Sequence, residues 1–135
     1  MYNLLDSFYF MNLTFDYVQT FLLETFGHDK NILGVMIFGS FARVSADASS
    51  DIDVFVLSRR LMSLERRSFE WNGVPFDVLF DDVKRMERFL VADRGNVRRA
   101  TSHMLARGKI IFERTSDFRR LQQCAQRNLL TKTKL

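Results

Sequence analysis

The sequence contains a single cysteine, Cys124, among its 135 residues. One cysteine cannot form an internal disulfide, which excludes the class of disulfide-stapled secreted domains and favours a reducing compartment. The apolar stretches near the N-terminus are interrupted by Asp6 and Asp16, and no basic stretch precedes them. We therefore expect no signal peptide, no membrane span and no membrane partner, and we expect the protein in the cytoplasm.

Long polar tracts, low-complexity segments, internal repeats and linkers are also missing. The composition, with 47% hydrophobic and 27% charged residues, is that of an ordinary globular protein. A chain of this length is the usual size of one domain and is too short for two independent cores. We predict a single domain over residues 1–135, with its core motif region at about 30–113 and a C-terminal helix at 117–130.

The basic residues are not gathered in one block, although the formal net charge is +4. This charge favours an anionic partner such as a triphosphate, while scattered solvated arginines remain the plainer interpretation. No basic stripe is interleaved with aromatic side chains, so a nucleic-acid partner is disfavoured. The arginine doublets are Arg59-Arg60, Arg66-Arg67, Arg98-Arg99 and Arg119-Arg120.

Hydrophobic periodicity predicts an α/β (α+β) fold, in which helices flank a mixed β-sheet. The dipeptide Asn72-Gly73 favours a two-residue hairpin turn, so the strands on either side of it should be antiparallel. We expect helices over 14–26, after Asp81-Asp82, from just after Asn96 to Gly108, and over 117–130, and strands over 33–38, 51–57, 68–71, 74–80 and 109–113.

Two aspartates begin the second predicted strand. Side chains two residues apart on a strand point to the same face, so Asp51 and Asp53 should lie together while Ile52 and Val54 face the other way. Adjacent carboxylates repel unless one is protonated or a cation lies between them, and oxygen ligands suit magnesium rather than zinc. The alternative is a solvated strand end at which Asp51 caps a loop.

A third aspartate, Asp77, interrupts the apolar segment 74–80. An unpaired carboxylate buried there would cost several kcal/mol, so it needs a partner. A metal ion shared with Asp51 and Asp53 would be one such partner, and a salt bridge to an arginine is the alternative.

Gly39-Ser40 follows a predicted strand directly and suits a phosphate contact. Glycine lets the backbone approach closely, and the serine amide and hydroxyl can donate hydrogen bonds. Alone, the pair would be an ordinary structural turn; beside three carboxylates it favours phosphate binding.

Taken together, these segments resemble the nucleotidyltransferase superfamily typified by DNA polymerase beta, in its small bacterial form. The resemblance is carried by Phe-Gly-Ser-Phe-Ala-Arg at 38–43, Ser-Asp-Ile-Asp-Val at 50–54 and Val-Pro-Phe-Asp-Val at 74–78. Residues 102–113 also resemble the helix and strand that follow in bacterial members. Many of those relatives carry a glycine where this chain has Val44. The difference affects the expected conformation of the loop 45–50 but removes no ligand.

The resemblance implies a magnesium-dependent transfer of a nucleoside monophosphate, foremost AMP from ATP, to a hydroxyl acceptor with release of pyrophosphate. Asp51 and Asp53 would bridge two magnesium ions, and Asp77 would hold the ion that activates the acceptor. Gly39 and Ser40 would hold the β- and γ-phosphates. Arg43 would be a further phosphate contact.

The resemblance leaves the acceptor open between a small molecule and a protein. Relatives that modify aminoglycosides or lincosamides have a further helical domain, so a second subunit (a homodimer or a helical partner), a protein acceptor or a longer native chain is expected here. Short members resemble antitoxins of toxin-antitoxin systems. The alternative function is therefore an antitoxin-like module that binds or adenylylates a HEPN-type ribonuclease toxin.

Overall fold

The computed structural model describes residues 14–39, 51–61 and 63–131. At its centre lies a five-stranded sheet with the strand order β3-β4-β2-β1-β5. Strands β2 and β4 are parallel, and every other neighbouring pair is antiparallel, so the predicted mixed sheet is confirmed. The strands are β1 (Ile32–Phe38), β2 (Ile52–Ser58), β3 (Glu65–Trp71), β4 (Val74–Asp82) and β5 (Lys109–Glu113).

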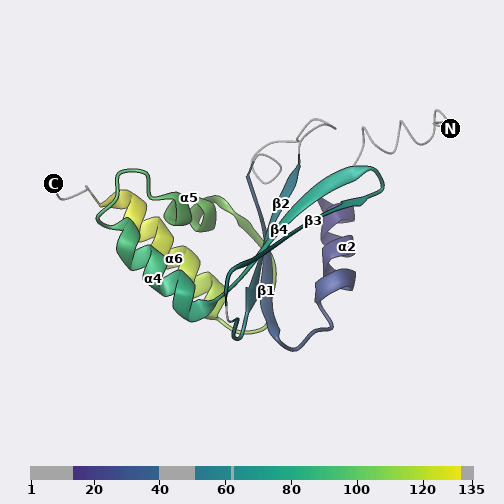
Figure 1. Cartoon of the computed structure of the whole chain (residues 1–135), viewed down its shortest axis with the longest axis horizontal. Coiled ribbons are helices and arrows are strands. Elements are labelled where there is room, and N and C mark those ends of the chain that lie inside the picture. The colour runs from purple at the N-terminus through teal and green to yellow at the C-terminus, as the bar shows by residue number, and fades with distance from the viewer. Residues whose placement is uncertain (1–13, 40–50, 62, 132–135) are drawn as a thin grey trace.

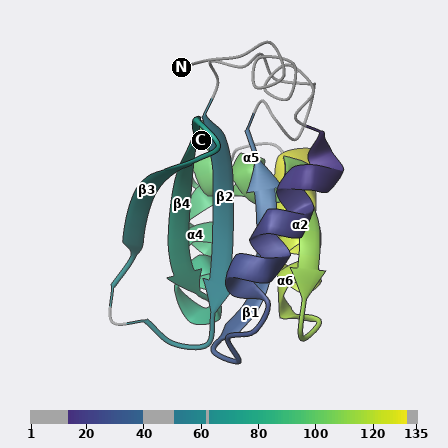
Figure 2. The same ribbon diagram turned by 90° about the vertical axis from the view of Figure 1, so that its right-hand side faces the viewer.

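Helices cover both faces of this sheet. The described helices are α2 (Phe15–Phe26), α4 (Val83–Asp93), α5 (Ala100–Arg107) and α6 (Asp117–Leu130). Figure 1 views the sheet close to edge-on, with α2 on one side and α4, α5 and α6 on the other. In Figure 2 the view is turned, and α2 crosses in front of the strands. Of the helices in the described ranges, none is long and apolar enough to cross a membrane.

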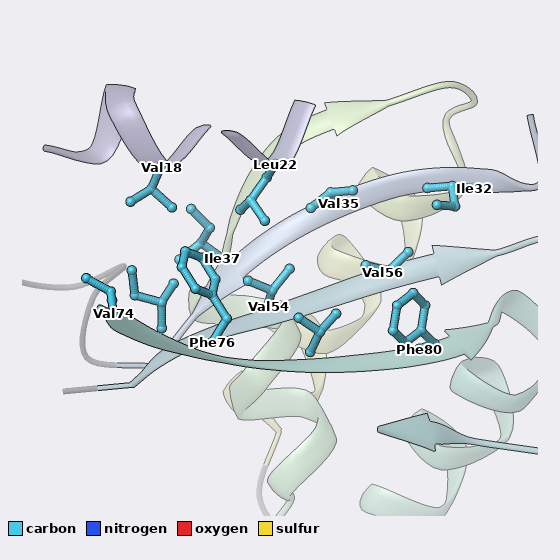
Figure 3. Close-up of a cluster of buried hydrophobic side chains, with 12 residues drawn as sticks. Val18, Leu22, Ile32, Val35, Ile37, Val54, Val56, Val74, Phe76 and Phe80 are labelled. Atoms are coloured by element: carbon cyan, nitrogen blue, oxygen red, sulfur yellow. The ribbon is translucent and has the colours of Figure 1, made fainter. Parts of the chain in front are cut away.

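The face covered by α2 holds the first of two hydrophobic cores (Figure 3). Alternate residues of β2, β3 and β4 enter it, as the period of two along a strand requires. Val54 and Val56 of β2 lie there beside Phe76 of β4, and Val18 and Leu22 of α2 cover them. The prediction that Ile52 and its alternate neighbours share a face is confirmed.

The opposite face packs against α4, α5 and α6 and holds the second core. Phe55 and Leu57 of β2 enter this core together with Leu90 of α4 and Phe118 of α6. Asp53 belongs to the same alternation as Phe55. The carboxylate of Asp53 therefore lies on the α4–α6 side of the sheet.

Local sequence determines the turn between β3 and β4 and the start of α2. Asn72 and Gly73 both have positive φ, 51° and 77°, as a two-residue type I′ turn requires, and Trp71 pairs with Val74 across it. The Oγ1 of Thr14 accepts a hydrogen bond from the N–H of Tyr17 at 3.2 Å and so caps α2.

The predicted start of the helix before Gly108 was wrong. Helix α5 begins at Ala100 rather than just after Asn96, and Val97 is 80% exposed outside it. Arg99 has φ 47°, a left-handed conformation that interrupts any helix continuing from Asn96. The N–H of Ser102 donates instead to Asp93 Oδ2 at 2.7 Å, so a carboxylate of α4 caps α5.

Candidate active site

Two of the three predicted carboxylates lie side by side on parallel strands. Asp53 of β2 is directly opposite Asp77 of β4 in the parallel register. Residues opposite one another in this register share a face of the sheet, and both side chains are half-buried. The structure thus brings Asp53 and Asp77 together on the α4–α6 side.

Negative charge is concentrated around Asp53. Asp51 is exposed and immediately precedes β2. Burial raises the pKa of the Asp53 carboxyl above its ordinary value, and the neighbouring carboxylates of Asp77 and Asp51 raise it further. An anion destabilised in this way gains from any cation placed between the carboxylates.

Gly39 lies against the Asp53 carboxylate. It follows the last residue of β1, Phe38, which pairs with Asp53 across the sheet. Gly39 has φ 75°, and a Cβ added there would overlap Asp53 Oδ2. Glycine is therefore required both by the backbone conformation and by the close approach of the carboxylate. Ser40 and Arg43, the other predicted phosphate contacts, lie outside the described residues, and their roles stay predictions.

Asp77 has an arginine partner, as the salt-bridge alternative for this residue anticipated. Arg66 of β3 donates from Nε to Asp77 Oδ1 at 2.9 Å and from Nη2 to Asp77 Oδ2 at 2.5 Å. These hydrogen bonds lower the pKa of Asp77. The side chain of Arg66 is 68% exposed and that of Asp77 is 21% exposed, so the pair lies at the surface of the site.

Arg66 was not predicted as a site residue from the sequence, although the strand register of the β3–β4 hairpin could have identified it. A two-residue turn at Asn72-Gly73 fixes the strand register and puts Ser68 opposite Asp77, as observed. Arg66 then lies two residues along β3 on the same face. At that diagonal position a long side chain can reach the carboxylate.

The described residues do not form a ready-made metal cage. Among them, no group of three or more His, Cys, Asp or Glu side chains is arranged so that it could hold a metal ion. In this arrangement both oxygens of Asp77 are hydrogen-bonded to Arg66. The donor chemistry nevertheless fits a hard cation, because the carboxylates next to Gly39 offer only oxygen ligands.

A second aspartate–arginine pair lies at the other end of β4 and was not predicted. Asp81 is fully buried, and its Oδ1 is 3.2 Å from Nε of Arg85, which lies in the first turn of α4. Asp82 caps α4 by accepting from the N–H of Arg85 at 2.9 Å, and it also accepts from the N–H of Leu61 at 3.1 Å. These contacts hold α4 and the β2–β3 connection against the end of β4.

The comparisons with known proteins agree with this architecture. The family model described as polymerase beta nucleotidyltransferase matches residues 22–117, and the chain belongs to this family. No curated protein sequence matches the chain significantly.

Solved structures show the same fold. A nucleotidyltransferase-like protein from Exiguobacterium sibiricum superposes with a TM-score of 0.62 at 15% sequence identity. The alignment covers 84% of the present chain but 39% of that protein. The present chain therefore corresponds in fold to well under half of this structural neighbour.

Proposed function

We propose that the protein is a magnesium-dependent nucleotidyltransferase that transfers a nucleoside monophosphate, foremost AMP from ATP, to a hydroxyl acceptor. The observation that carries this proposal is the juxtaposition of Asp53, Asp77 and Gly39. Two carboxylates are paired in register on parallel strands, and a glycine with positive φ lies against one of them. Asp51 is near enough to influence the pKa of Asp53 and would be the third ligand.

Asp51, Asp53 and Asp77 would hold magnesium through their carboxylate oxygens. When bound, the metal would supply charge neutralisation of the triphosphate and a lowered pKa of the acceptor hydroxyl. The raised pKa of Asp53 supports this role, because the carboxylate is costly as an anion without a cation nearby. An arrangement that is unfavourable in the free protein and is relieved by its ligand is common at functional sites.

Phosphate contacts would come from the end of β1. The backbone of Gly39 would contact a phosphate, and Ser40 and Arg43 would add hydrogen bonds and charge. The acceptor hydroxyl would lose its proton to solvent as its oxygen attacks the α-phosphorus, and the bond from that phosphorus to the oxygen bridging to the β-phosphate would break. Pyrophosphate leaves with the bonding electron pair. No covalent enzyme intermediate is needed, so the residues of the chain contribute positioning and electrostatics.

The acceptor is proposed to be a small molecule or a protein, bound with the help of a second subunit or partner. The proposed phosphate contacts include residues of the 40–50 segment, and the structural neighbour is much longer than this chain. Asp77 is proposed to hold the ion that activates the acceptor. We therefore place the proposed acceptor beside Asp77, next to the edge strand β3.

The experiment that tests the function uses the purified protein, α-labelled nucleoside triphosphates, magnesium and a cell lysate. Label is followed into protein, RNA and small molecules. The proposal expects magnesium-dependent transfer that falls roughly 10²- to 10⁴-fold in Asp53→Asn and is unchanged in Arg67→Gln. Label in one small helical protein would indicate the toxin-modifying version. Transfer that persists in Asp53→Asn, or no transfer from any triphosphate, would count against the proposal.

A further inference from the structure

The ion pair between Arg66 and Asp77 bears on how the proposed metal site is filled. Resting on the proposed function, we propose that Arg66 competes with the divalent cation for Asp77, so that this edge-strand arginine sets the cation affinity of the site. In the protein without metal, the guanidinium supplies the positive charge beside the paired carboxylates. Cation binding then requires Arg66 to release Asp77.

The geometry of the pair makes the two cations alternatives. Arg66 engages both carboxylate oxygens of Asp77, one through Nε and the other through Nη2. Such a two-bond arrangement orients the carboxylate toward the guanidinium as well as neutralising its charge. A divalent ion ligated by the same oxygens would lie within a few ångströms of a fixed positive charge, and the two would repel.

Arg66 lies where it can leave at little cost. Within the described part of the chain, strand β3 is at the edge of the sheet and pairs with β4 alone, and the side chain of Arg66 is 68% exposed. Ion pairs at such exposure contribute little to folding stability and are weakened by salt. Moving the guanidinium into solvent leaves no buried donor without a partner. The pair can therefore open without disturbing the strand.

The neighbouring residue, Arg67, provides a matched control. It carries the same charge on the same strand and has the same side-chain exposure, 68%. Its side chain is on the other face, where the guanidinium carbon lies 4.9 Å from the centre of the Phe80 ring and Nη2 lies 3.2 Å from Glu65. Arg67 does not touch Asp77, so its replacement changes the net charge equally without freeing the carboxylate.

The test is a calorimetric titration of the metal-free 135-residue chain with Mn²⁺ at fixed ionic strength. We expect Arg66→Gln to lower the Kd about 3- to 10-fold relative to Arg67→Gln, because only the former removes the competing cation. Arg66→Lys should fall between Arg66→Gln and the wild type, because it keeps a positive charge but loses the two-bond contact. An unchanged or weaker affinity in Arg66→Gln would overturn the proposal.

Two further variants separate this inference from the function on which it rests. Asp53→Asn and Asp77→Asn should both weaken Mn²⁺ binding if the carboxylates form the site. If they do so while Arg66→Gln has no effect, the metal site stands and the competition is wrong. If neither aspartate variant changes Mn²⁺ binding, the proposed metal site is wrong and the competition fails with it. Circular dichroism of each variant checks that it is folded.

Discussion

The two aspartate–arginine pairs on β4 use the same chemistry at opposite levels of burial. Asp77 and Arg66 lie near the start of the strand, where the arginine comes from an exposed edge strand. Asp81 and Arg85 lie at its end, where the aspartate is fully buried and the arginine is only 19% exposed. Both aspartates point to the α4–α6 side of the sheet, because they are four residues apart on one strand.

The environments push the two pKa values in opposite directions. Hydrogen bonds from Arg66 lower the pKa of Asp77, whereas burial raises the pKa of Asp81 even though Arg85 and the N–H of Asp82 act against it. Among the described residues, Asp81 Oδ2 also has no hydrogen-bond partner. The exposed Arg66–Asp77 pair can open for a ligand, whereas the buried Asp81–Arg85 pair holds α4 against β4. Side-chain exposure therefore distinguishes the two pairs.

The largest expected effect comes from breaking the buried pair. Arg85→Met removes the cation beside Asp81 and the hydrogen bond that Arg85 Nη2 donates to the carbonyl of Leu61. A buried carboxylate left without its partner should reduce the free energy of unfolding by about 3 kcal/mol, measured by urea denaturation. Arg66→Gln, at the exposed pair, should cost far less. Equal losses in the two variants would show that burial does not separate the pairs.

A smaller effect is expected at Gly39, where the site meets the backbone. Gly39→Ala introduces a Cβ at φ 75° and against Asp53 Oδ2, so it should cost about 1–2 kcal/mol and also weaken Mn²⁺ binding. Gly73→Ala is the control, because Gly73 has nearly the same φ, 77°, in the hairpin turn away from the carboxylates. Both variants should be destabilised, but Gly73→Ala should bind Mn²⁺ like the wild type. Equal binding in Gly39→Ala would contradict the close contact with Asp53.

The smallest effect, and one of opposite sign, is expected at Asp53. The folded-state pKa of Asp53 is raised above the ordinary 3.8. The free energy of unfolding therefore falls as the pH rises from about 3.8 through the raised pKa, and this loss persists at neutral pH. In metal-free buffer at pH 7, Asp53→Asn should therefore be more stable than the wild type by about 0.2–1 kcal/mol. The difference should vanish in thermal melts well below pH 3.8, where Asp53 is protonated in both the folded and the unfolded state. A less stable Asp53→Asn at neutral pH would show that the carboxylate is not strained.

Sequence patterns predicted the bounds of helices and strands where neighbouring residues determine those bounds. The strand Lys109–Glu113 and the helix Asp117–Leu130 have their predicted bounds, because hydrophobic periodicity and Gly108 mark them. The beginning of β3 was missed, since Glu65, Arg66 and Arg67 are all exposed and show no alternation of apolar residues. The start of α5 was missed because Asp93, which caps it, is nine residues away from Ser102.

For the candidate site, too, the sequence predicted some features and not others. Residue types and spacing named Asp51, Asp53 and Asp77, and the resemblance to a known superfamily joined them. The parallel pairing of β2 with β4 is a tertiary fact that the spacing of the aspartates does not contain. The burial of Asp81 could not be predicted either, because it depends on α4 packing across the end of β4.

Metal-dependent nucleotide binding at these carboxylates can be measured by calorimetric titration of the protein with a non-hydrolysable ATP analogue, in magnesium and in excess EDTA. We expect saturable binding in magnesium, because the triphosphate and the carboxylates repel one another without a cation. We also expect EDTA to abolish this binding and Asp53→Asn to weaken it at least about 10-fold. Tight binding in EDTA that Asp53→Asn leaves unchanged would contradict a metal-dependent nucleotide site at these carboxylates.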